Sequence, residues 1–376
     1  MPDETILQKK RVLITGASGF IGARLVEKLS TVDNYFVTAL VRDARKVEQL
    51  IGLSEETVVT DLSNRQGIEQ VVKGSDIVIN LAYDFKSNKQ KNLQAFTNLH
   101  DACIKHRVKK FVQVSSIVVY DGWPTIDIDE KSSSNPSGLE DYRDTKISIE
   151  QLLDISSANN LLHTTVLQPT IVYGPNSWLW TDAIVEKLST GTLILPSNCK
   201  GVCNAVYVDD VVDALLLAIE KTAVSGEKYI ISGPEPITWK HFYEGYNKAL
   251  KKDSIVYVNT ETLSTEQSTL TWKIKKIIAN PFTLSNWKVV QYFLKIIDKL
   301  FGSEGIKKIK YCLQRLKKSG GKIVYYPTED EIELYCSTGI CSISQAKDKL
   351  GYEPTRDFNT GFKITTSYIN EKYSLK

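Results

Sequence analysis

The sequence predicts an α/β protein with a doubly wound parallel sheet and a smaller, mainly helical C-terminal lobe. A glycine-rich turn follows the first apolar segment, Arg11–Thr15. Short apolar segments then alternate with amphipathic ones as far as Gly174 and Pro175. Repeated strand–helix units of this kind form parallel sheets with helices on both faces.

The composition is typical of a soluble globular protein, with 376 residues, 42% of them hydrophobic and 24% charged. The N-terminus lacks the basic and apolar regions of a secretory signal, and no apolar run approaches about 20 residues, so we expect a cytoplasmic location. The six cysteines lack zinc-ligand spacing, and the four histidines do not cluster. We therefore predict no metal site and expect free thiols.

The predicted strands are rich in Val, Ile and Leu without strict alternation, as expected of strands buried on both faces. They are Arg11–Thr15, Tyr35–Val41, Thr57–Thr60, Asp76–Ala82, Lys109–Ser115 and Thr164–Gln168. The predicted helices between them are Phe20–Ser30, Ala44–Ile51, Arg65–Lys73, Lys89–His106 and Leu139–Ser157.

A later strand and helix over Val206–Glu220, and a strand over Glu227–Ser232, extend the same pattern. We therefore assign residues 1–172 and 202–233 to a dinucleotide-binding Rossmann domain. Residues 173–201 and 234–376 are assigned to a substrate-binding lobe.

The glycine turn has the spacing Gly-x-x-Gly-x-x-Gly between a strand and a helix. Its glycines allow close approach of the backbone to phosphate, and the helix N-terminus offers unpaired N–H groups. The turn predicts a pyrophosphate site made by Gly16, Ser18, Gly19, Phe20, Ile21 and Gly22.

The end of the second strand bears on cofactor choice. Arg42 lies 20 residues after Gly22, where an acidic residue would bind the ribose of NAD. A guanidinium suits a 2′-phosphate, so NADP is favoured over NAD, although Asp43 would serve NAD if the register shifts by one residue. Asp61 and Leu62, at the next strand end, are expected beside the adenine.

A candidate catalytic set follows. Tyr142 and Lys146 are spaced i, i+4 and therefore share one helix face. An ammonium and an oxidised nicotinamide nearby would lower the pKa of the phenol, which is about 10 in isolation. Ser116 ends a predicted strand and is placed to hold the oxygen that Tyr142 protonates or deprotonates.

These motifs together resemble the extended short-chain dehydrogenases/reductases, in the branch of NAD(P)-dependent nucleotide-sugar epimerases and dehydratases. The resemblance runs from Arg11 to about Trp239 and includes segments 76–82, 168–175 and 206–211. It implies that Ser116, Tyr142 and Lys146 are catalytic. Lys146 would also bind the nicotinamide ribose.

The resemblance also implies binding residues beyond the glycine turn. Further cofactor contacts are expected from Leu81, Ala82, Tyr83, Asn92, Ser115, Tyr142, Lys146, Pro169 and Ile171. Substrate contacts are expected from Tyr83, Asp84, Ser116, Tyr142, Asn176 and Asn204.

The chain departs from the family pattern at three places. Asp121 follows Tyr120 where glycine is common. Gln168 replaces the arginine of Arg-Pro-x-x-Val-Tyr-Gly-Pro. Ile117 and Val118 stand where the dehydratases carry an Asp-Glu pair, so the chain lacks the acid and base for 4,6-dehydration.

The segment Thr271–Lys322 is strongly basic, with thirteen Lys and Arg against Asp298 and Glu304. Its apolar residues fall at helical spacing and predict two amphipathic helices with cationic faces. A solvated face, a peripheral membrane contact and a site for a substrate diphosphate all fit this pattern. Nucleic-acid binding does not, because no recognised module is present.

The predicted activity is hydride transfer at a secondary carbinol or ketone of a nucleotide-activated sugar, ending in epimerisation or reduction. One alternative is an NADPH-dependent ketoreductase or hydroxysteroid-type dehydrogenase acting on a lipophilic substrate. Another is a non-catalytic regulator that senses dinucleotides, against which the intact proton-transfer residues argue. The resemblance also implies a homodimer formed through Lys89–His106 and Leu139–Ser157.

Overall fold

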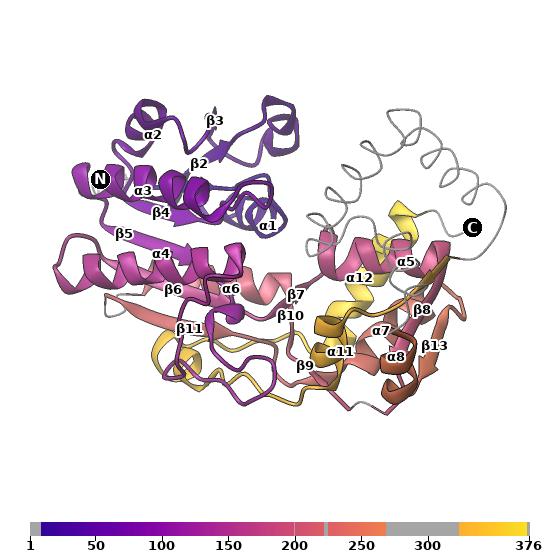
Figure 1. Ribbon diagram of the computed structural model, residues 1–376. Coiled ribbons are helices and arrows are strands. Elements are labelled where there is room, and N and C mark those ends of the chain that lie inside the picture. Colours follow the sequence, from indigo (N-terminus) through magenta and orange to yellow (C-terminus); the bar gives the residue numbers. More distant parts are fainter. Residues whose placement is uncertain (1–8, 199, 222–224, 268–322, 374–376) are drawn as a thin grey trace, which may run out of the picture. The chain divides into compact units, whose positions relative to one another are not determined.

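The computed structural model describes residues 9–198, 200–221, 225–267 and 323–373 (Figure 1). The chain forms two compact units. The first lies within Met1–Trp180, Asn204–Pro236 and Gly339–Ile364. The second lies within Thr181–Cys203, Ile237–Thr338 and Thr365–Lys376.

The first unit is built on a seven-stranded sheet in the order β11-β6-β5-β4-β1-β2-β3, with every neighbouring pair parallel. Its strands are β1 (Lys10–Thr15), β2 (Tyr35–Val41), β3 (Glu56–Val59), β4 (Ile77–Asn80), β5 (Lys110–Val114), β6 (Thr164–Pro169) and β11 (Glu227–Ile231). The strand order reverses between β1 and β4, and ligands of such sheets bind beyond the carboxyl ends at this point.

Helices cover both faces of this sheet (Figure 1). They are α1 (Phe20–Leu29), α2 (Arg65–Val72), α3 (Lys89–Lys105), α4 (Asp141–Ala158) and α6 (Val208–Glu220). α3 packs against α2 and α4, whereas α1 packs against α6. A core that includes Leu13, Val78 and Phe111 of the strands joins the sheet to α2, α3 and α4. The predicted doubly wound fold is confirmed.

The predicted helix Ala44–Ile51 is wrong. The chain forms two short 3₁₀ turns there, η1 (Ala44–Lys46) and η2 (Glu48–Leu50). The Asp43 carboxylate caps the first turn by accepting from the backbone N–H of Arg45. Only Leu50 is buried, so the segment has no apolar face to stabilise a longer helix.

The first unit also contains a segment that the sequence analysis assigned to the substrate lobe. Residues 339–364 include η5 (Ala346–Leu350), and Cys341 forms a β-bridge to Ile128. The buried Tyr352 hydroxyl donates to the carbonyl of Ser232 (2.8 Å). Contacts between segments so distant in the sequence leave no pattern in the neighbouring residues from which they could be predicted.

The remaining elements of the first unit lie close to the sheet. η3 (Ile117–Val119) follows β5, and β7 (Ile171–Tyr173) pairs in parallel with β10 (Ala205–Tyr207). α12 (Phe358–Lys372) begins in this unit and continues into the second.

The second unit holds strands that the sequence analysis did not predict. β8 (Gly191–Pro196) lies between β13 (Ile255–Val258) and β14 (Ile323–Tyr325), and both pairs are parallel. β9 (Val202–Cys203) pairs with β12 (Ile237–Thr238) in antiparallel fashion. The other helical elements of the described residues are η4 (Trp178–Asp182), α5 (Ala183–Thr190), α7 (Trp239–Ala249), α8 (Thr260–Gln267) and α11 (Glu329–Cys336).

One further prediction lies outside the described residues, and another is met only in part. The basic segment 271–322 lies outside the described residues. Cys103, Cys203 and Cys341 are buried free thiols, but Cys336 is in a disulfide. The spacing of the cysteines in the sequence could not predict this disulfide, because the fold decides which cysteines come close enough to bond. Within the described ranges, no helix combines the length and apolar character needed to cross a membrane.

Candidate active site

The glycine turn between β1 and α1 is packed too tightly for side chains. A Cβ on Gly22 would lie 2.2 Å from the carbonyl oxygen of Gly16. Gly16 has a φ of +66°, and its Cβ would lie 2.9 Å from the backbone nitrogen of Ala82, just after β4. Gly19 is the N-cap of α1 and provides no side-chain cap for the N–H groups of the first turn, which includes Phe20 and Ile21. The turn therefore fits a dinucleotide pyrophosphate.

A buried polar row, which the sequence analysis missed, underlies this turn. The Thr15 hydroxyl donates to Asn80 Oδ1, and Asn80 Nδ2 donates to Gln113 Oε1 (2.8 Å). These side chains come from β1, β4 and β5, so the row ties together the strands on both sides of the switch point. Polar residues within apolar strands were the available signal.

At the end of β2, Arg42 faces two carboxylates. Its guanidinium lies 3.0 Å from Asp84 Oδ2 and 4.0 Å from Asp61 Oδ2, and its side chain remains 60% exposed. Asp43 instead pairs with Arg45, whose hydrogen bonds lower the pKa of Asp43 to about 2. Arg42, and not Asp43, therefore lies among the residues expected around the adenosine.

Asn92 supports the site through the loop after β4. Its Oδ1 accepts from the N–H of Asp84 (3.0 Å), and its Nδ2 donates to the carbonyls of Asp84 (3.0 Å) and Ser87 (3.2 Å). The buried amide thus fixes the course of residues 84–87. We had expected Asn92 to contact the cofactor, but its hydrogen bonds serve the loop.

The three predicted catalytic side chains come together beyond β5. Ser116 caps η3 and is hydrogen-bonded to the hydroxyl of Tyr142. Lys146 Nζ donates to the carbonyl of Val114 (2.8 Å) and lies 5.8 Å from the centre of the Tyr142 ring. β5 and the first turns of α4 position this set.

Burial controls the protonation of these groups. It raises the pKa of Tyr142 to about 12, against the lowering effect of the Ser116 hydrogen bond. It also lowers the pKa of Lys146, which is 4% exposed, to about 8. The expected lowering of the phenol pKa is not found, because desolvation of the phenol outweighs the effect of the Ser116 hydrogen bond.

Two aromatic side chains from the loop after β4 surround Tyr142. The Tyr83 ring meets it edge-on at 4.8 Å between centroids, and Phe85 stacks on it at 5.4 Å. Phe85 is 60% exposed, so it offers an apolar surface beside the reactive phenol. Tyr83 is among the binding residues predicted from the sequence, and Phe85 is not.

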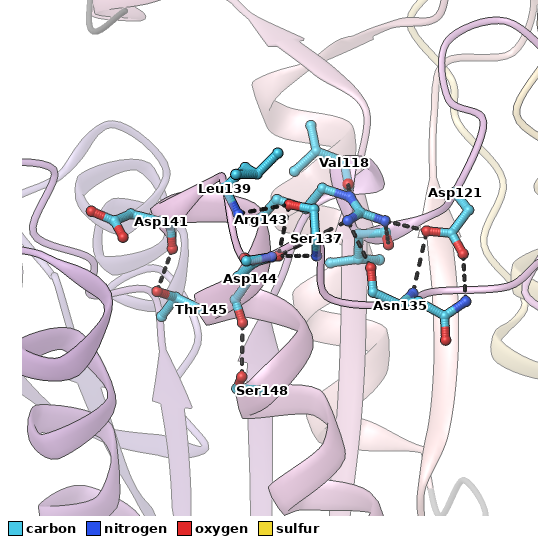
Figure 2. Close-up of polar contacts among 12 residues, drawn as sticks. Val118, Asp121, Asn135, Ser137, Leu139, Asp141, Arg143, Asp144, Thr145 and Ser148 are labelled. Atoms are coloured by element: carbon cyan, nitrogen blue, oxygen red, sulfur yellow. Dashed lines mark hydrogen bonds and ion pairs between the residues drawn. The ribbon is translucent and has the colours of Figure 1, made fainter.

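Figure 2 shows how the two residues after Tyr142 hold the neighbouring loops. Arg143 Nε donates to the carbonyl of Val118 (2.9 Å), and its Nη1 donates to that of Asn135 (2.8 Å). Arg143 also pairs with Asp121. Asp144 accepts from the N–H groups of residues 137 and 138. These contacts fix the turn after Ser116 against the start of α4.

Several predicted binding residues are oriented elsewhere. The Ser115 hydroxyl donates to Glu150, so it is turned into the core. Asn204 donates to the carbonyl of Gly339 (2.9 Å) and accepts from the N–H of Cys341 (3.0 Å). Its amide therefore holds the 339–341 segment, which the sequence pattern could not show.

Four other predicted binding residues lie at strand ends or in turns. Pro169 lies at the end of β6 and Ile171 in β7, and both are buried. Asn176 is exposed and has a φ of 67°, a conformation that asparagine tolerates better than most residues. Leu62 accepts from Asn98 through its carbonyl (2.9 Å). No cluster of potential metal ligands is found in the described part of the chain.

Residues 12–232 match the model of the NAD dependent epimerase/dehydratase family. The chain belongs to this family. It is an enzyme of the extended short-chain dehydrogenase/reductase type, as the motifs predicted.

The relatives carry different activities. A 3β-hydroxysteroid-dehydrogenase/decarboxylase of Arabidopsis thaliana is 26% identical over 94% of this chain and 78% of its own. The UDP-glucose 4-epimerase of Vibrio cholerae is 24% identical over 95% of this chain and 94% of its own. The structure of a UDP-glucuronic acid 4-epimerase from Bacillus cereus, in complex with NAD, has a TM-score of 0.67 at 19% identity. It covers 96% of this chain and 99% of its own, and shows the shared fold.

Proposed function

We propose that this enzyme transfers a hydride at a secondary carbinol or ketone, with Tyr142 as the acid and base. The observation that carries the proposal is the assembly of Ser116, Tyr142 and Lys146 in the same unit as the glycine turn. A bound nicotinamide dinucleotide would accept or supply the hydride.

The side chains would act as follows. The Ser116 hydroxyl, already hydrogen-bonded to Tyr142, holds the substrate oxygen within reach of the phenol. Tyr142 donates its proton to that oxygen in reduction and accepts one in oxidation. The protonated Lys146 favours the phenolate that forms in reduction and would be required in oxidation. Tyr83 and Phe85 exclude water from one side of the phenol.

We propose a nucleotide-activated sugar as the substrate, because relatives along nearly the whole chain include a UDP-glucose 4-epimerase. A lipophilic secondary alcohol or ketone is the second candidate. The exposed ring of Phe85 beside Tyr142 favours it, as does the hydroxysteroid-dehydrogenase relative.

For the cofactor we retain the preference for NADP over NAD. Arg42 supports it, because its guanidinium is exposed at the end of β2, while Asp43 is engaged by Arg45. Asp61 and Asp84 oppose it, since a 2′-phosphate would have to compete with them for Arg42. We also retain a homodimer and a peripheral membrane contact through residues 271–322 as proposals.

The experiment that tests this function follows both reduced nicotinamide and the sugar or sterol products with the purified enzyme. It offers UDP-hexoses, 3β-hydroxysterols and their 3-ketones, each with NAD(H) and NADP(H). Conversion of a UDP-hexose to its epimer without net change in cofactor supports the sugar proposal. Turnover of sterols alone selects the second candidate, and turnover of neither class contradicts both.

A further inference from the structure

One buried carboxylate collects side chains from three strands beneath the catalytic set. Glu150 is 2% exposed and lies one helical turn after Lys146 on α4. It accepts from the hydroxyl of Ser115, at the end of β5. Both of its oxygens accept from Gln168 Nε2 of β6 (3.1 and 3.0 Å), and Lys228 Nζ of β11 lies 3.2 Å away.

One partner of this carboxylate, Gln168, departs from the family pattern. That pattern has arginine at position 168, where this chain has a fully buried glutamine. Because residue 168 contacts Glu150, an arginine there would place its charge on that carboxylate. Gln168 provides hydrogen bonds to Glu150 and accepts one from Tyr120 (2.7 Å), but it carries no charge.

Lys228 supplies the missing charge from the neighbouring strand. It lies in β11, which pairs with the strand of Gln168, and its ammonium lies between Glu150 and the more exposed Asp154 (2.9 Å). Burial lowers the pKa of Lys228, but the two carboxylates outweigh this effect and raise it. A buried carboxylate without a cation is strongly unfavourable, so this pairing has a physical reason.

We propose that Gln168 and Lys228 together replace the arginine of the family pattern as partners of Glu150, and that Glu150 is a positioning residue. It holds Ser115, and through it the end of β5 that carries Ser116. It also holds a negative charge near the ammonium of Lys146.

The groups around Lys146 and Glu150 determine how Glu150 affects the pKa of Lys146. Lys146 faces the rings of Tyr83 and Tyr142, the carbonyl of Val114 and the charge of Glu150. Glu150 faces Ser115, Gln168 and Lys228, with Tyr120 beyond Gln168 and Asp154 beyond Lys228. Burial lowers the pKa of Lys146, and Glu150 raises it. Loss of the charge on Glu150 therefore lowers the pKa of Lys146 further.

The test follows the titration of Lys146 by NMR in the full-length protein labelled with ¹³C at lysine Cε. The Lys146→Arg variant identifies the resonance by its disappearance. In the wild type we expect a midpoint near pH 8. In Glu150→Gln the midpoint falls by about one pH unit. In Lys228→Met the midpoint rises, because the charge of Glu150, no longer paired with Lys228, acts more strongly on Lys146.

The double variant Lys228→Met/Gln168→Arg moves the cation to position 168 and is expected to restore the wild-type midpoint. The control Asp154→Asn removes the more exposed partner of Lys228 and is expected to leave the midpoint unchanged. An unchanged midpoint in Lys228→Met, or a folded double variant that fails to restore it, would overturn the proposal.

If Lys228→Met does not fold, Glu150→Gln and the double variant decide, since both remove the need for Lys228. The inference takes the catalytic role of Lys146 from the proposed function. The titration itself needs no substrate or cofactor. The inference can therefore fail while turnover is found, and it can hold while no turnover is found.

Discussion

At the scale of single residues, the charge of Lys146 is required for the chemistry but is unfavourable where the side chain lies. Lys146 must stay charged to favour the phenolate of Tyr142, yet it is buried against two aromatic rings and a backbone carbonyl. A pKa of about 8 leaves it mostly protonated at neutral pH with little margin. The structure therefore stores an unfavourable charge at the place where the chemistry requires one.

This charge predicts a pH dependence of stability. The pKa of Lys146 is about 8 in the folded protein and 10.5 for an unperturbed lysine, so between these values the unfolded chain binds more protons. The free energy of unfolding contributed by Lys146 should therefore rise from pH 8 to pH 10.5, by on the order of 3 kcal/mol. Urea unfolding of the wild type and Lys146→Met across this range measures the difference, and parallel curves for the two proteins would refute it.

The position of Arg42 predicts cofactor selectivity. Arg42→Ala should weaken NADPH binding by roughly tenfold relative to NADH, about 1.4 kcal/mol, because a guanidinium contact to the 2′-phosphate is lost. The neighbouring Arg45→Ala is the matched control, since Arg45 is 89% exposed and paired with Asp43. Fluorescence titration with both nucleotides measures the ratio. Equal losses for NADH and NADPH would contradict a role in selectivity.

At the scale of elements, the catalytic geometry depends on how η3 is fixed to α4. Arg143 makes this connection through the carbonyls of Val118 and Val119 and through Asp121 (Figure 2). Because Ser116 immediately precedes η3, any movement of this turn changes the distance between the serine and Tyr142.

Arg143→Met should therefore lower kcat at least tenfold while leaving the affinity for NAD(P)H within about twofold, because the glycine turn is untouched. The loss of buried hydrogen bonds should also reduce the free energy of unfolding by about 1–3 kcal/mol. Arg65→Met, on the exposed side of α2, is the control and should change neither quantity. An equal loss of cofactor affinity in Arg143→Met would point to general disruption instead.

The sequence predicted those elements whose physical cause is local. The glycine turn, the apolar strands and the Tyr142–Lys146 spacing are readable because each needs only neighbouring residues. The prediction of a helix over residues 44–51 was wrong because this segment has no apolar face to pack against the rest of the unit. The predicted binding roles of Ser115 and Asn204 failed for another reason. Their hydrogen-bond partners, Glu150 and the 339–341 segment, are distant in the sequence and are brought close only by folding.

At the scale of the whole molecule, the chain contributes to its first unit from three separate stretches, the last of them within Gly339–Ile364. The basic segment 271–322 falls within the sequence range of the second unit, between α8 and β14. Its pattern of apolar and cationic residues is the feature of the sequence that the proposed catalytic chemistry does not use.

We predict that this segment binds anionic membrane surfaces. The full chain should pellet with phosphatidylcholine vesicles containing phosphatidylserine, and not with phosphatidylcholine alone, and added salt should release it. Replacing Lys295, Lys299, Lys308 and Lys310 by Gln should abolish pelleting and leave the unfolding midpoint unchanged. Pelleting that is independent of lipid charge would contradict the prediction.

The central claim is that the phenol of Tyr142 moves the proton. The most direct measurement compares Tyr142→Phe with the wild type, using whichever substrate the panel identifies, together with NAD(P)H affinity. We predict a loss of kcat of at least about a hundredfold, since general acid–base catalysis contributes about 10²–10⁴-fold, with cofactor affinity retained. A Tyr142→Phe enzyme that turns over at near the wild-type rate would contradict the account.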